Sequence, residues 1–83
     1  MLDDKQLKWR CRRGVRELDV LFGKYLEKQY PELDLAQKQC FQTLLEVQDP
    51  IIMDWLFGNA APEAEHAELV PTIERLRVLS GLA

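Results

Sequence analysis

Residues 11–19 read Cys-Arg-Arg-Gly-Val-Arg-Glu-Leu-Asp, at the point where one amphipathic segment ends and the next begins. Helices commonly end at a glycine, because glycine adopts backbone angles that other residues avoid, so this stretch predicts a helix junction at Gly14. Three arginines around one glycine are more than a junction requires. Because arginine donates directional hydrogen bonds to carboxylates, phosphates and backbone carbonyls, the stretch also predicts a docking surface.

The segments on either side of this junction have helical spacing. Before it, Asp3 and Gln6 have the spacing of a capping box, and Leu7 and Cys11 form an apolar stripe from which Trp9 is displaced. We expect this first helix to end at Gly14. A second helix is predicted over about residues 15–29, because its apolar residues recur every three or four positions. These residues are Val15, Leu18, Leu21, Phe22, Tyr25 and Leu26.

Three further helices are predicted downstream. Asp34 and Gln37 form a second capping box, before a segment whose buried side is expected to include Leu35. Asp49 is expected to cap a fourth, short helix with Pro50 at its first position, and Gly58 to end it.

The fifth helix lies within residues 63–79, where Pro71 interrupts the apolar stripe. An interior proline disfavours a helix, so we expect the helix to start late, near Glu68. No segment has the alternation of a strand. The prediction is therefore an all-α protein, with residues 1–83 forming a single helical domain, a compact bundle of five short helices.

The composition narrows the function classes. No apolar run approaches the length of a bilayer span, and the N-terminus resembles neither a secretory signal nor a transit peptide, so we expect a cytoplasmic bacterial protein or a trimmed matrix protein. Cys11 and Cys40 lack the spacing of a redox or metal motif and are interpreted as reduced. His66 has no second histidine or cysteine at a ligand spacing, so no metal site is predicted and the residue is interpreted as a solvated surface side chain.

Charge is distributed unevenly along the chain. Residues 1–24 carry seven basic and four acidic groups, whereas the whole chain has a net charge of −3. The basic end leaves open a nucleic-acid-binding or toxin-antitoxin regulatory module. The overall acidity, together with Glu17 and Asp19 inside the basic stretch, favours protein binding instead.

Catalytic signatures are missing from the sequence. It contains no Walker-type loop, no Gly-x-Gly-x-x-Gly and no nucleophile with a matching base, so the chain is not expected to be an enzyme. Arg13 and Glu17 are four residues apart, which would allow them to pair on a helix. Such a pair would not explain Gly14, which would let the backbone of a partner approach closely.

Here the sequence resembles a known family. Arg13, Gly14 and Glu17 form an R-G-x-x-E motif within Trp-x-x-Arg-Arg-Gly-x-x-Glu-Leu-Asp. With the later Leu-Leu-Glu-x-x-Asp-Pro and x-x-x-Asp-Trp-Leu, nearly the whole chain is similar to the succinate dehydrogenase assembly factor family, the RGxxE-motif FAD assembly factors. The last helix departs from the family pattern at Pro71, and nothing functional is carried over from it.

The resemblance implies a five-helix assembly factor that binds the flavoprotein subunit of succinate dehydrogenase, and of fumarate reductase in bacteria. It would promote covalent attachment of FAD to that subunit without binding FAD tightly itself, as a monomer when free and without membrane insertion. Three residues match the functional motif: Arg13, Gly14 and Glu17. Around them we place Trp9, Arg10, Arg12, Arg16 and Asp19. Asp49, Pro50 and Trp55 match too, but capping and core packing explain them better. A third hypothesis is that the protein itself binds flavin.

Overall fold

In the computed structural model, which describes residues 2–58 and 60–81, the chain is all helical, as the sequence predicts. Five α-helices and two short 3-10 helices follow one another. They are α1 (Asp4–Arg10), α2 (Arg16–Lys28), η1 (Tyr30–Glu32), α3 (Leu35–Leu44), α4 (Asp49–Phe57), η2 (Ala64–Leu69) and α5 (Val70–Ser80). None of the helices in the described part is long and apolar enough to cross a membrane.

Both predicted capping boxes are present. The carboxylate of Asp3 accepts a hydrogen bond of 2.8 Å from the amide of Gln6, and the Gln6 side chain accepts one from the amide of Asp3. Asp34 and Gln37 repeat the arrangement at the start of α3. Each box satisfies amides that the first turn of a helix leaves without partners, so α1 and α3 begin where the sequence indicates.

The core forms around α2, whose inward face is buried as its periodicity predicts. Phe22 lies edge-on to Phe41 of α3, with ring centroids 5.8 Å apart, and Tyr25 lies 4.8 Å from the same ring. The buried hydroxyl of Tyr25 accepts a hydrogen bond of 3.2 Å from Nε of Arg75 in α5. Helix α2 is thereby held between α3 and α5.

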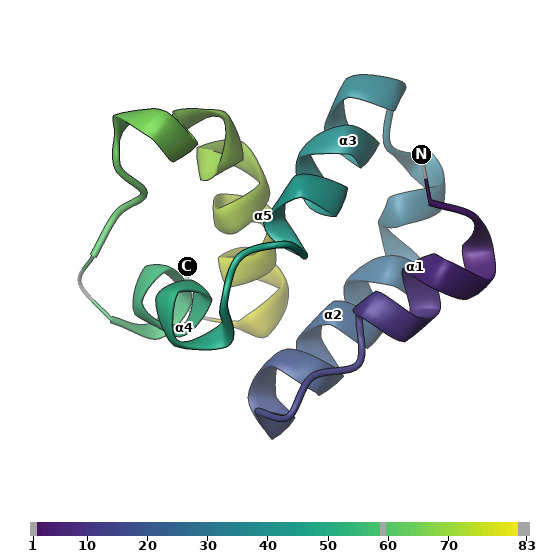
Figure 1. The fold of residues 1–83 in the computed structure, drawn as a ribbon, viewed down its shortest axis with the longest axis horizontal. Coiled ribbons are helices and arrows are strands. Elements are labelled where there is room, and N and C mark those ends of the chain that lie inside the picture. Colours follow the sequence, from purple (N-terminus) through teal and green to yellow (C-terminus); the bar gives the residue numbers. More distant parts are fainter. Residues whose placement is uncertain (1, 59, 82–83) are drawn as a thin grey trace.

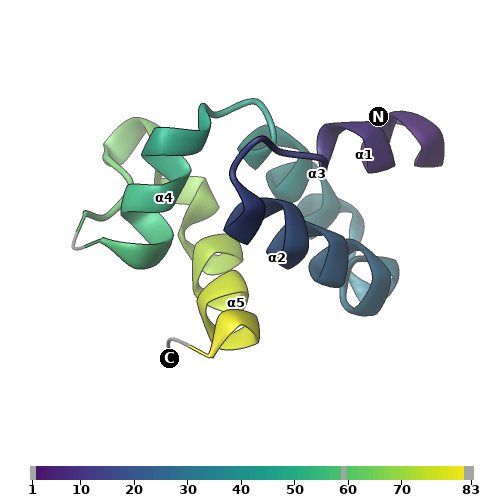
Figure 2. The same cartoon turned by 90° about the horizontal axis from the view of Figure 1, so that it is seen from below.

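The ribbon shows how these elements are arranged. In Figure 1, α1, α2 and α3 lie together on one side and α4 with η2 on the other, with α5 between them. Figure 2 shows the loop from α1 to α2 running beside the connection from α3 to α4. Two loops far apart in the sequence therefore meet at the start of α2.

The final helix starts late. Its first residue is Val70, and Pro71 lies in the first turn. Backbone amides in the first turn have no acceptor within the helix, so a proline, which lacks an amide proton, costs no hydrogen bond there. The expectation of a late start is confirmed, and the preceding residues form the 3-10 helix η2.

Three local predictions about the helices are wrong. Helix α1 ends at Arg10 rather than at Gly14, because the amide of Arg13 donates to the Asp19 carboxylate and the chain leaves the helix. Gln48, not Asp49, caps α4. Leu35, expected on the buried side of its helix, is 61% exposed because it occupies the first position of α3, where the helix has not yet reached the core. A pair between Arg13 and Glu17 would require one helix through both residues, and α1 ends before Arg13.

Candidate functional site

Arg13 points into the protein. Its Nη2 donates a hydrogen bond of 2.6 Å to the carbonyl of Leu45, the residue that ends α3, and its Nη1 lies 3.4 Å from a carboxylate oxygen of Asp49 in α4. The guanidinium also lies over the ring of Phe22, 5.4 Å from its centroid. A cation at a helix C-terminus meets the negative end of the helix dipole, so these contacts hold the motif loop against two helices and the core.

The backbone of this loop is held by Asp19. Its carboxylate accepts a hydrogen bond of 2.9 Å from the amide of Arg13, across six residues. Cys11, immediately before the arginines, is buried at 4% exposure. Burial raises the pKa of its thiol from 9.0 to about 11, with Arg13 acting in the opposite direction and Asp19 adding to the rise. The thiol is therefore protonated at neutral pH and behaves as a small apolar side chain.

Gly14 and Glu17 form the outward half of the motif. Both are exposed, and no ion pair within 4.0 Å joins Glu17 to Arg13 in the described part of the chain, because Arg13 is turned toward Asp49. A Cβ built on Gly14 meets no atom within 4 Å, and the glycine does not have a positive φ. The isolated protein therefore needs a glycine here for neither packing nor backbone conformation.

The other predicted residues surround the motif on several faces. Trp9 is 74% exposed on α1, consistent with its position off the apolar stripe. Arg10 lines a hollow against α3, whereas Arg12 and Asp19 line another between α1 and α2. Arg16 lines a third hollow, which it shares with Glu17. The fold thus gathers Arg13, Gly14 and Glu17 at one corner and directs the surrounding cations in different directions.

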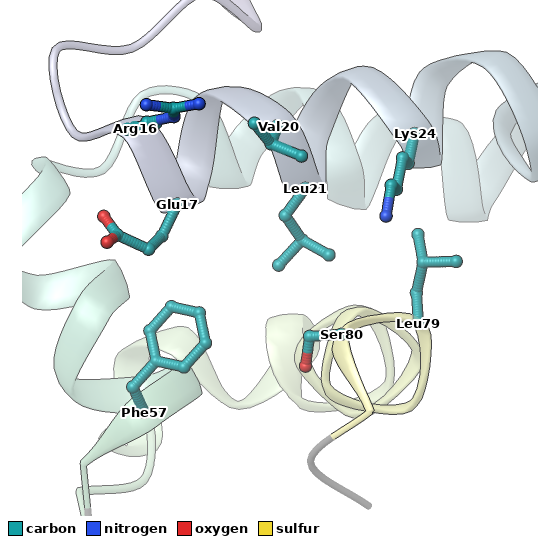
Figure 3. Close-up of a pocket in the computed structure, with 8 residues that line it drawn as sticks. All are labelled: Arg16, Glu17, Val20, Leu21, Lys24, Phe57, Leu79 and Ser80. Atoms are coloured by element: carbon teal, nitrogen blue, oxygen red, sulfur yellow. The ribbon is translucent and has the colours of Figure 1, made fainter.

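The third hollow contains residues that sequence reasoning missed. Figure 3 shows it between α2 and the ends of α4 and α5, with Glu17 extending toward Phe57. Phe57 and Val20 are 41% and 48% exposed. The two residues belong to separate segments, and the sequence does not reveal that they line one hollow, because that depends on how the helices pack.

Asp49 has a different role from the helix cap that the sequence predicts. Its position before Pro50 suggests a helix cap, but its carboxylate is turned to Arg13, and both side chains are largely buried, at 15% exposure for Arg13 and 22% for Asp49. No local spacing indicates this ion pair, since the partners are far apart in the sequence. Trp55, in contrast, is buried at 3% exposure, which confirms its interpretation as a core residue.

His66 is less exposed than the sequence suggests. Its ring packs 5.4 Å from that of Trp55, and its Nδ1 lies 3.6 Å from Glu63 and 3.9 Å from Glu65. His66 is therefore half-buried rather than the solvated surface side chain that the sequence indicates. The potential ligand atoms of the three residues lie within 4.8 Å of one another, but exposed acidic groups often come this close without an ion.

Fold and site together define a small helical protein with a rigid corner that presents an exposed glycine and charged side chains. Comparison with known proteins supplies the family. The family model described as flavinator of succinate dehydrogenase matches residues 5–79, and the chain belongs to this family.

Several curated relatives carry the name FAD assembly factor SdhE. The protein from Coxiella burnetii is 37% identical over 76 residues, which cover 90% of this chain and 93% of the relative. The one from Idiomarina loihiensis is 41% identical over 69 residues, covering 82% and 77%. The one from Legionella pneumophila strain Paris is 38% identical over 71 residues, covering 86% and 90%. No solved structure matches the chain significantly.

Proposed function

We propose that this protein binds the flavoprotein subunit of succinate dehydrogenase and promotes the covalent attachment of FAD to it. The observation that carries the proposal concerns Gly14. A Cβ built there meets no atom within 4 Å, so packing within the isolated chain does not require a glycine at this position. An exposed glycine lets a partner's backbone approach closely. Membership of the flavinator family supports the identity of that partner.

The two halves of the motif have different tasks in this proposal. Arg13 holds the loop through Leu45 and Asp49 and fixes where the outward half points. Gly14 and Glu17 make the contact with the partner. Arg10, Arg12 and Arg16 are exposed around them and orient the two proteins, since charged groups at the rim of an interface mainly steer and align. Trp9 adds an exposed aromatic side chain from α1.

Catalysis would then be positional. The flavin and the residue to which it becomes attached belong to the partner, and docking would hold that subunit in a conformation in which its own groups complete the bond. Holding reactants in a productive geometry accelerates a reaction without a nucleophile from the helper. In this sense the protein assists an autocatalytic step and is not itself an enzyme. The flavoprotein subunit of fumarate reductase would be a second client of the same surface.

Co-expression tests the proposal. The flavoprotein subunit is produced with and without this protein, and covalent flavin is read from in-gel fluorescence after denaturing electrophoresis. We expect a strong increase in covalent flavin when the protein is present. Equal signals in both samples would refute the proposed function. Titration of the purified protein with free FAD should show weak or no binding, which separates an assembly factor from a flavin carrier.

Two exposed glycines provide a matched pair for the site. Gly14→Leu should abolish the increase in covalent flavin, while the helical circular dichroism and the unfolding midpoint remain near wild type. Gly23→Leu is the control, because Gly23 of α2 is also exposed and its Cβ would also meet no atom within 4 Å. Loss of folding in Gly14→Leu would instead assign that glycine a structural role.

A further inference from the structure

The hollow beside the motif is built from three helices. It has a volume of about 370 Å³ and lies between the outer side of α2 and the C-terminal ends of α4 and α5. Leu21 and Leu79 lie between the helices, with Phe57 at one end, and Figure 3 shows Glu17 and Lys24 reaching across the opening from α2. We call this hollow the α2 groove. It begins at Glu17, so it is continuous with the outward half of the motif.

The walls of the α2 groove carry apolar side chains that the fold leaves open to water. Val20 is 48% exposed and Phe57 is 41% exposed, on helices that each also bury several apolar residues. Scattered exposed apolar residues are ordinary on a protein surface, but two that line one concave site beside a charged motif have the composition of a binding site.

The rim of the groove is cationic in an acidic chain. Arg16 and Lys24 stand on the α2 side with one acid, Glu17, while the chain as a whole has a net charge of −3. Within the described residues, neither cation lies within 4.0 Å of a carboxylate. Two cations without partners next to an apolar trough fit an occupant that carries an apolar side chain and a carboxylate close together.

We propose that the α2 groove receives a segment of the flavoprotein subunit in which an apolar side chain neighbours an acidic residue. The apolar side chain would cover Val20 and Phe57, and the carboxylate would pair with Lys24 or Arg16. This inference rests on the proposed function and extends it, since the docking surface then runs from Gly14 along α2 to the end of α5. Continuity with Glu17, which belongs to the motif proposed to contact the flavoprotein subunit, favours this occupant over a second copy of the chain.

Binding measurements test the groove. The purified flavoprotein subunit without covalent FAD is titrated with wild-type protein and with the variants Phe57→Asp, Val20→Asp and Lys24→Glu. We expect each variant to weaken the affinity about tenfold or more, as truncation of an interface anchor does. Phe57→Asp alters the α4 wall, whereas Val20→Asp and Lys24→Glu alter the α2 wall, so a folding defect in one variant, detected by circular dichroism, leaves the others informative.

Matched controls come from the same helices. Val78→Asp alters an exposed apolar residue of α5 that lines a different hollow, and Lys28→Glu reverses a charge one turn after Lys24 outside the groove. Both controls should bind like wild type. Equal affinities for the groove variants and the controls would overturn the inference.

The same titration separates this inference from the proposed function. If Gly14→Leu loses binding while the groove variants retain it, docking occurs at the motif and the groove proposal fails alone. If wild-type protein does not bind the subunit at all, both the groove proposal and the proposed function fail. Sedimentation of the free protein adds a further check, because self-association abolished by Phe57→Asp, with unchanged subunit binding, would identify a second copy as the occupant and refute the proposal.

Discussion

Two arginines in this molecule make the same bond in different settings. Arg13 donates a hydrogen bond of 2.6 Å to the carbonyl of Leu45 at the end of α3, and Arg77 of α5 donates one of 2.6 Å to the carbonyl of Leu56 near the end of α4. Only Arg13 also faces a carboxylate and an aromatic ring, and only Arg13 is followed by an exposed glycine and acid.

The difference teaches where function resides in the motif. An inward arginine that satisfies helix carbonyls is a structural device that this small bundle uses twice. The feature that distinguishes the motif corner is its outward half, which the fold leaves open. The variants below, ordered from the largest expected effect to the smallest, test whether the two corners differ in this way.

Arg13→Ala should lower the free energy of unfolding by about 3 kcal/mol, because it removes the charge-assisted hydrogen bond to the Leu45 carbonyl and leaves a largely buried Asp49 without its cation. Chemical denaturation measures this loss. Arg13→Ala/Asp49→Ala should be less destabilised than the two single losses added together, since removal of both charges leaves none unpaired. Strict additivity would show that the ion pair contributes nothing.

The motif corner should also respond to alkaline pH, because it contains the buried thiol of Cys11. The folded state holds this proton up to a pKa of about 11, above the ordinary value of 9.0, so the unfolded state loses it first. Stability is therefore retained below pH 9 and falls as pH rises toward 11, by up to about 2–3 kcal/mol. Denaturation of wild type and Cys11→Ala across this range measures the difference. A Cys40→Ala control should keep the wild-type slope, and an equal slope in Cys11→Ala would contradict the prediction.

Arg77→Ala removes the corresponding bond at the second corner. We expect a loss of about 1.5–2 kcal/mol in unfolding free energy, smaller than for Arg13→Ala because no carboxylate is left unpaired. Covalent flavin formation, measured at a temperature where the variant is folded, should remain at the wild-type level. A loss of that activity would mean that the outward half of the motif is not what distinguishes the two corners.

Gly23→Ala should have the smallest effect and the opposite sign. Gly23 lies inside α2 with open space around its missing side chain, so alanine should raise the stability by about 0.5–1 kcal/mol through helix propensity. Thermal unfolding measures the gain. Gly14→Ala, outside a helix, should leave the unfolding midpoint nearly unchanged, and a large shift there would contradict the open environment of that glycine.

Local signals predicted most of the fold because they act within a few residues. The capping residues Asp3 and Asp34 and the late start at Pro71 are examples, since each depends only on neighbouring backbone groups. The error at Asp49 arose because a distant contact decides its role. Asp49 has the sequence of a helix cap, but the guanidinium of Arg13 attracts its carboxylate across the fold.

The same limit applies to the candidate site. The motif predicts that Arg13, Gly14 and Glu17 belong to the site. It does not predict that Arg13 points inward while the other two residues remain exposed. Phe57 could not be associated with the site, because only the packing of α4 against α2 and α5 brings it to the groove. The roles of the motif residues in docking stay predictions until the variants are measured.

The two tryptophans of the chain differ sharply in environment, with Trp9 exposed at 74% and Trp55 at 3%. This contrast gives the protein two intrinsic optical reporters. A soluble quencher such as acrylamide reaches the exposed indole and not the buried one, so Trp9 emission should become protected when a partner covers α1. The buried indole, beside His66, instead responds to loss of the core. Docking and unfolding can thus be followed separately without adding a label.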